Sequence, residues 1–223
     1  MRIILRGCSC LAMLTLTCAS PLMARESPQT WPDTPLSRTQ ALAELQTLNA
    51  QLLSHPSATL TLERWCAAHK LAAEPRVVAH RVHGADKPLP DGARALLGIG
   101  ADEPVRYRRV ALSCGDVVLS DADNWYVPSR LTPEMNQQLD TSDAPFGKVV
   151  QPLHFRRETL SADLLWSPLP EGWDSGTPLP HTDDKTLAIP DHVLQHRAVL
   201  YTGSNQPFSL VVESYTSRVL VRP

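Results

Sequence analysis

The chain has 223 residues, of which 43% are hydrophobic and 20% are charged, and its formal net charge at pH 7 is −2. This length suits a single domain with a sizeable hydrophobic core. The mildly acidic balance, with no basic block, excludes a protein that holds nucleic acid by charge.

Residues 1–24 have the layout of a secretory signal peptide. Arg2 and Arg6 form a basic start, an apolar stretch follows over residues 11–17, and small residues lead to Ala24. The apolar stretch is too short to span a bilayer stably. Cleavage after Ala24 removes two arginines and no acids, so the charge becomes −4, and the mature chain is expected to be periplasmic or secreted. A retained or lipidated anchor is the alternative, and membrane contact is expected only through this segment.

Cleavage also leaves two of the five cysteines, Cys66 and Cys114. In an oxidising compartment these two could form a disulfide bond. Two buried thiols that never meet are the alternative, and the sequence does not decide between them.

Residues 25–56 are expected to form an irregular lead-in and then an amphipathic helix. Ser37 is the expected N-cap, and Gln40, three residues later, completes a capping box. Pro56 ends the helix. Its apolar stripe consists of Leu42, Leu45, Leu48 and Leu52.

Residues 57–223 are expected to form the main domain. Its helices come first and mostly hairpin-linked strands follow, which predicts an α+β fold: an antiparallel sheet with helices packed on one face. The expected elements are a helix over about 60–72, a strand over 76–82, a hairpin across 105–128 that turns at Gly115-Asp116, a helix that starts at Thr132, strands near 148–160, 192–201 and 207–221, and a proline-rich loop over 167–190.

No metal site or cofactor is predicted. The close histidine pairs are His80 with His83 and His192 with His196, and no third ligand is signalled for either pair. Serine-hydrolase and phosphate-binding motifs are also absent from the sequence.

Two charged residues lie within otherwise apolar strands. Arg109 shares a strand face with Tyr107 and small apolar residues, where a partly desolvated guanidinium would attract a carboxylate strongly. An arginine that snorkels at the sheet margin is the alternative. Glu213 alternates with Val211 and Tyr215. That alternation alone favours a carboxylate on the wet face of a strand over one placed in a pocket.

Four motifs resemble, in order and spacing, those of the chorismate lyase family and of the related effector-binding domain of bacterial transcription regulators. They are "VRYRRVALSCGDVVLSDADNWYVP", "DAPFGKVV", "HFRRETL" and "HRAVLYTGSNQPFSLVVESY". The resemblance covers the chain from about Ser57 to Val221. It implies a six-stranded antiparallel sheet with helices on one side and an internal ligand cavity.

The resemblance also implies roles for four residues. The family's arginine for the substrate carboxylate corresponds to Arg109, and its catalytic glutamate, which contacts the substrate hydroxyl, corresponds to Glu213. The apolar pocket residue of the proline-x-glycine motif corresponds to Phe146, and a further pocket position corresponds to Ala58. On this basis Glu213 is expected to point inward.

Two features depart from the family. Asp121, or Ala122 if the register slips by one, stands where the family has a glycine, and an acid beside a dianionic substrate would repel it. The signal-like N-terminus is the second departure, because chorismate is made in the cytoplasm.

The leading functional hypothesis is a chorismate-lyase-like enzyme that releases pyruvate from chorismate to give 4-hydroxybenzoate without a cofactor. Arg109 would hold the ring carboxylate, and Glu213 would act as the acid/base group. The alternative is an exported binding domain for a small aromatic carboxylate that performs no chemistry. A purely structural role in the cell envelope is the third reading, and the sequence does not predict the oligomeric state.

Overall fold

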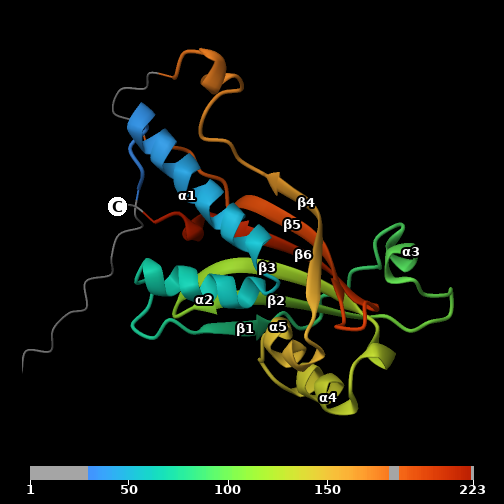
Figure 1. The fold of residues 1–223 in the computed structure, drawn as a ribbon. Coiled ribbons are helices and arrows are strands. Elements are labelled where there is room, and N and C mark those ends of the chain that lie inside the picture. The colour runs from blue at the N-terminus through green and yellow to red at the C-terminus, as the bar shows by residue number, and fades with distance from the viewer. Residues whose placement is uncertain (1–29, 181–185, 222–223) are drawn as a thin grey trace, which may run out of the picture.

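The computed structural model describes residues 30–180 and 186–221, so the predicted signal peptide lies outside the described residues. Its centre is a six-stranded antiparallel sheet, as predicted, and the strands follow the order β1-β2-β3-β6-β5-β4 (Figure 1). The strands are β1 (Val77–Arg81), β2 (Arg106–Cys114), β3 (Val117–Tyr126), β4 (Arg156–Leu164), β5 (His192–Tyr201) and β6 (Pro207–Thr216).

Helices cover most of one face of this sheet, as Figure 1 shows for α1 and α2. They bury one apolar cluster between α1, α2 and the sheet, and a second between α4, α5 and the sheet. The helices are α1 (Pro35–Ser54), α2 (Ala58–Ala68), α3 (Ala93–Leu97), α4 (Pro133–Thr141) and α5 (Phe146–Val149).

The first helix begins earlier than its sequence predicted. Its N-cap is Thr34, whose side chain accepts a hydrogen bond from the amide of Ser37 at 3.1 Å, and Pro35 occupies the first helical position. The expected cap at Ser37 is therefore wrong, because a threonine followed by a ring-fixed proline already supplies the start. By contrast, α4 begins where expected, with Thr132 capping the amide of Met135.

The hairpin of β2 and β3 turns at Gly115 and Asp116, as predicted. Gly115 has a φ of +54°, and a Cβ there would lie 2.9 Å from the Cβ of Ala72 after α2. The turn therefore needs glycine for its backbone and for the close approach of the segment that follows α2.

Two expected strands have other bounds than predicted: β4 starts and ends later, at Arg156 and Leu164, and β6 ends earlier. Val149 and Val150 belong to a short helix and the turn after it, and β4 starts only at Arg156. At the other end, β6 stops at Thr216, whose hydroxyl oxygen accepts a hydrogen bond from the amide of Arg218 and starts a 3-10 turn. β-branched content predicts an extended segment but not its ends.

The second face of the sheet is covered at one end by α3 and the loop around it, which the sequence did not predict. Ala93 and Leu97 of α3 pack with Trp125 and Leu210 of the central strands. Both faces of β6 are consequently buried at that end, so the alternation of apolar residues along β6 cannot identify a wet face.

Cys66 on α2 and Cys114 at the end of β2 form a disulfide bond. This decides the alternative that the sequence left open. The bond attaches the α2 part of the helix layer to the strand beneath it, across 48 residues of chain.

Across residues 30–180 and 186–221, none of the helices has the combination of length and apolar character needed to cross a membrane.

Candidate functional site

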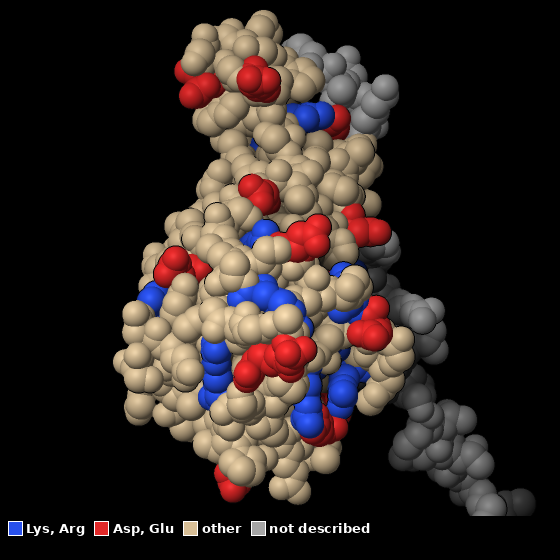
Figure 2. Space-filling model, turned by 90° about the vertical axis from the view of Figure 1, so that its right-hand side faces the viewer, with Lys and Arg blue, Asp and Glu red and all other residues tan. Residues whose placement is uncertain are grey.

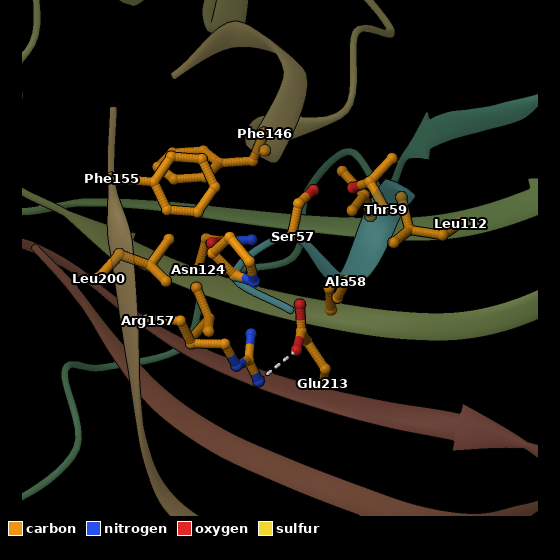
Figure 3. Close-up of a pocket in the computed structure, with 15 residues that line it drawn as sticks. Ser57, Ala58, Thr59, Leu112, Asn124, Phe146, Phe155, Arg157, Leu200 and Glu213 are labelled. Carbon is orange, nitrogen blue, oxygen red and sulfur yellow. Dashed lines mark ion pairs between the residues drawn. The ribbon is translucent and has the colours of Figure 1, made fainter. Parts of the chain in front are cut away.

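A hollow lies between the helix layer and the sheet, on the face covered by α2 and α5 (Figure 3). Its walls come from the start of α2, the start of α5 and the five strands β2 to β6, so residues far apart in sequence meet there. The described residues that line it are Pro56, Ser57, Ala58, Thr59, Val110, Leu112, Ala122, Asn124, Phe146, Gly147, Phe155, Arg157, Leu200, Val211 and Glu213.

The hollow is small in this structure. Its cavity volume is about 30 Å³, and the space between the lining atoms reaches about 400 Å³ once the part open to solvent is included. The enclosed part has room for about two water molecules. A more open groove adjoins it and shares Pro56, Phe155 and Arg157 with its walls, so these three residues stand between the hollow and solvent.

Glu213 points into this hollow, and the strand register explains why. Val110 on β2, Ala122 on β3, Glu213 on β6 and His196 on β5 lie opposite one another across four neighbouring strands. Residues paired across a sheet share a face. Glu213 is only 8% exposed. The reading that placed it on a wet face is therefore wrong, and the inward reading that the resemblance favoured holds.

Arg157 is the basic partner of Glu213. Its Nη2 lies 2.7 Å from Oε2 of Glu213, and its side chain is 5% exposed. Burial, the largest single influence, lowers the pKa of Arg157, but the charge of Glu213, the nearby Tyr215 and the contact with the Glu213 carboxylate together outweigh it, and the pKa is raised. A charged group with no opposite charge would be costly in such a place, so the two residues stabilise each other.

Several donors in this pair remain unfilled. Nη2 of Arg157 meets Glu213 as an ion pair, but neither Nε nor Nη2 has a partner with hydrogen-bond geometry within the described part of the chain. The Oδ1 atom of Asn124 is likewise buried without a partner among the described residues. Unpaired buried polar groups cost free energy, so this cluster is suited to receiving polar atoms of a bound molecule.

Two further residues lie beside Glu213 on the same face of the sheet. The hydroxyl of Tyr215 donates to its Oε2 atom at 3.1 Å, and burial followed by the charge of Glu213 raises the pKa of Tyr215 well above its usual value. His196, directly opposite on β5, has its pKa lowered to about 4 by burial and then by the charge of Arg157. At neutral pH both groups are therefore uncharged.

Arg109 does not meet Glu213, which corrects the expectation that the two face each other across the hollow. Arg109 shares a face with Tyr107, as predicted, but that is the opposite face of the sheet. There its Nη1 atom lies 3.9 Å from Oδ1 of Asp123, and its side chain is 32% exposed. Its neighbour Val110 lines the hollow, so strand alternation turns Arg109 away from it.

Arg157 was missed although its motif was recognised. β4 is an edge strand with few apolar residues, so its sequence indicates little about which face is covered. The available signal was the alternation of Phe155 and Arg157, both of which line the hollow.

The other two predicted pocket residues, Phe146 and Ala58, both line the hollow and are 5% and 7% exposed. Phe146 is the first residue of α5, and its ring stacks near Phe208 of β6 with centroids 6.3 Å apart. Ala58 is the first residue of α2, held in place by the N-cap Ser57. Their roles in binding stay predictions.

Asp121 is not beside the hollow. It lies on the opposite face, where its Oδ2 atom is 2.8 Å from Nε2 of His192. Ala122 lines the hollow instead. The repulsion expected between Asp121 and an anionic ligand is therefore removed by the register of β3.

Within residues 30–180 and 186–221, no cluster of three or more histidine, cysteine or acidic residues is arranged to hold a metal ion. His192 and His196 sit on opposite sides of a register shift in β5; His196 bonds to Asn49 of α1, whereas His192 bonds to Asp121.

The fold is similar to solved structures of bacterial transcriptional regulators. It is similar to the effector domain of PhnF from Mycobacterium smegmatis, with a TM-score of 0.48 and 14% identity over 73% of this chain and 89% of that one. It is also similar to a GntR-family transcriptional regulator from Enterococcus faecalis V583, with a TM-score of 0.39 and 14% identity over 62% of this chain and 93% of that one. For the possible transcriptional regulator YydK from Bacillus subtilis, the TM-score is 0.38 and the identity is 19%. This match covers 63% of this chain and 57% of YydK, so the chain spans little more than half of that regulator.

No family model matches the chain. Among curated proteins, the sequence is 54% identical over 214 residues to "Uncharacterized protein y4mC" of Sinorhizobium fredii strain NGR234, a match that spans 95% of this chain and 90% of that protein. Identity at this level over nearly the whole length shows common descent, and the chain belongs to the y4mC family.

Proposed function

We propose that this chain binds a compact molecule that carries a carboxylate, in the hollow between α2, α5 and the sheet. The observation that carries the proposal is Arg157, a buried guanidinium whose Nε and Nη2 donors have no hydrogen-bond partner among the described residues. A carboxylate matches the fork of a guanidinium and would fill these donors.

The shape of the walls supports an aromatic or otherwise flat apolar body for this ligand. Phe146 and Phe155 lie together at one side of the hollow, while the polar groups of Asn124 and Glu213 lie near Arg157 (Figure 3). Leu200 and Val211 add further apolar wall. Mostly apolar walls with a few placed polar groups are typical of small-molecule sites. Because the enclosed volume is small, we expect the wall around Pro56 to move when the ligand enters.

The test uses 4-hydroxybenzoate and two matched variants. Ala122→Leu fills the hollow, whereas Ala111→Leu adds the same atoms to the opposite face of the neighbouring strand. We expect 4-hydroxybenzoate to raise the melting temperature of the wild type and of Ala111→Leu but not of Ala122→Leu. The filled variant is itself expected to lose about 1–3 kcal/mol of stability. The proposal fails if the wild type gains nothing, or if filling the hollow leaves the gain unchanged.

A second candidate function is the chorismate-lyase-like reaction. It is favoured by Glu213, which is buried and turns one oxygen away from Arg157 (Figure 3), and to which the resemblance assigns the role of the family's catalytic glutamate. Arg109 faces the other side of the sheet, so Arg157 would have to hold the ring carboxylate. Incubation of the mature protein with chorismate, followed by chromatography for 4-hydroxybenzoate, tests this. Wild-type turnover that is lost in Glu213→Gln supports it, and no product from the wild type removes it.

We also propose that the chain acts outside the cytoplasm. The signal-like residues 1–24 support export, and so does the Cys66–Cys114 disulfide, because such bonds persist mainly in oxidising compartments. Protein recovered from the periplasm or the medium should begin at Arg25. Recovery of the full-length chain from the cytoplasm with both thiols free would contradict the proposal.

A further inference from the structure

We propose that the ligand of this hollow is a zwitterion: a compact acid that also carries an ammonium group. Arg157 would receive its carboxylate and Glu213 its ammonium. This inference rests on the proposed function and makes it more specific, because it states what the second polar group of the ligand must be.

The first argument is the charge of the walls. Among the described residues that line the hollow, Arg157 carries the positive charge and Glu213 carries the negative one. His196, behind Glu213, is neutral because its pKa is lowered to about 4, chiefly by burial. The walls therefore have a net charge of about zero at neutral pH.

A further cation on the same face of the sheet is not part of these walls. Arg108 of β2 is buried outside the lining, and its Nη2 atom donates to the backbone carbonyls of Ser142 and Ala144, while its Nε and Nη1 atoms have no hydrogen-bond partner among the described residues. Burial lowers its pKa, while the charges of Asp143 and Asp140 act in the opposite direction. Arg108 is thus oriented toward the α4–α5 connection and its carboxylates.

The second argument is the pattern of unfilled donors and acceptors. Arg157 offers buried donors, whereas Asn124 offers a buried acceptor, the Oδ1 atom, and none of these atoms has a partner among the described residues. Glu213 directs its second oxygen toward the same space, near Ala58 (Figure 3). A simple carboxylic acid fills only the donors. An acid that also carries an ammonium fills both sets.

The third argument is energetic. A ligand with a single negative charge would add an unbalanced charge beside Glu213 in a site of low exposure, and burying an uncompensated charge is costly. A zwitterion adds no net charge, and its charges alternate with those of the ion pair: carboxylate, Arg157, Glu213, ammonium. The Arg157–Glu213 pair can then stay intact during binding.

The experiment compares three probes of nearly equal shape and different charge, by calorimetric titration at neutral pH. They are 4-ethylbenzoate, which is an anion, 4-(aminomethyl)benzoate, which is a zwitterion, and 4-ethylbenzylamine, which is a cation. We expect the zwitterion to bind the wild type about tenfold more tightly than either singly charged probe, as one charge-assisted hydrogen bond predicts. If the anion binds the wild type as tightly as the zwitterion or more tightly, the inference is wrong, although binding of a carboxylate in the hollow stands.

Two variants sharpen the test. Glu213→Gln leaves the walls with one positive charge, so we expect 4-ethylbenzoate to bind this variant about tenfold more tightly than it binds the wild type. In this variant, 4-(aminomethyl)benzoate should no longer bind more tightly than 4-ethylbenzoate. Asp123→Asn makes the same chemical change beside Arg109 on the opposite face and should leave the ranking of the probes unchanged.

The outcomes distinguish a failure of the zwitterion inference from a failure of the proposed carboxylate binding. An unchanged ranking in Glu213→Gln overturns the role of Glu213 as the ammonium partner. If Glu213→Gln does not fold, the three-probe comparison on the wild type still decides. Failure of all three probes to bind the wild type overturns both this inference and the proposed function.

Discussion

The two faces of the sheet each carry an arginine–carboxylate pair, and the pairs differ in their surroundings. Arg157 and Glu213 lie 2.7 Å apart beneath the helix layer, with side chains 5% and 11% exposed. Arg109 and Asp123 lie 3.9 Å apart on the opposite face, with 32% and 14% exposed. The same residue types thus form a desolvated pair in a hollow and a loose pair near solvent, and the packing of distant helices creates the difference.

The two pairs also differ in the number of their polar atoms that have hydrogen-bond partners. Asp123 receives hydrogen bonds from Lys87 and Tyr107 in addition to its contact with Arg109. In the hollow, Arg157 has donors without hydrogen-bond partners among the described residues. The opposite-face pair is therefore part of a network in which the carboxylate has several partners, whereas the hollow keeps buried polar atoms that the proposed ligand would satisfy.

The largest expected effect is the loss of one member of the buried pair. Arg157→Ala should lower the free energy of unfolding by about 3–5 kcal/mol, because Glu213 is left buried without its cation. Arg109→Ala should cost about 1 kcal/mol or less, because its pair is partly solvated and Asp123 keeps Lys87. Urea unfolding of both variants measures the two losses of unfolding free energy. Equal losses would show that the buried pair contributes no more to stability than the pair on the opposite face.

Removal of the disulfide tests how firmly the helix layer is attached to the hollow's face. Because 48 residues separate Cys66 from Cys114, the double variant with both replaced by alanine should be less stable by about 2–4 kcal/mol. Treatment of the mature wild type with a reductant should give the same loss and should leave the double variant unaffected. A reductant effect that persists in the double variant would rule out this bond as the cause.

A smaller effect should appear as a dependence of stability on pH. His196 has its folded pKa lowered to about 4, below its ordinary value of 6.5, so protons bind the unfolded state preferentially. Its contribution is fully present above about pH 6.5 and is lost as pH falls to about 4, on the order of 3 kcal/mol in total. Unfolding of His196→Gln across this range should show a flatter pH profile than the wild type.

The control for that profile is a histidine on the other face. His192→Gln changes a half-exposed residue that bonds to Asp121. If His196→Gln and His192→Gln flatten the profile equally, burial beneath the helix layer is not the cause.

The sequence predicted the architecture because its local patterns agree with the fold. Thr132 with Pro133 marks a helix start, Gly115 marks the hairpin turn, and the order of helices and strands indicates α+β. It failed for α3, a helix of five residues between two glycines, and for the boundary before β4. Segments this short are decided by what they pack against rather than by their own pattern.

The candidate site was predicted in part. Glu213, Phe146 and Ala58 were named and all line the hollow, whereas Arg109 was named and Arg157 was not. Glu213 and Phe146 were identified through motifs that each contain one residue of suitable chemistry, and Ala58 was identified as a further pocket position implied by the resemblance. Two neighbouring arginines precede Val110, and a second pair precedes Glu158, so a choice between adjacent residues required the strand register.

The amino-acid sequence by itself determined which residues share a face, because a strand turns successive side chains to opposite sides. It could not determine which face the helices cover, because both sides of β6 are apolar and α3 covers part of one of them. The tertiary structure decided that Glu213 is buried, that Arg157 is its partner and that Cys66 meets Cys114. Each of these depends on contacts between segments far apart in the chain, whose free energies no local pattern contains.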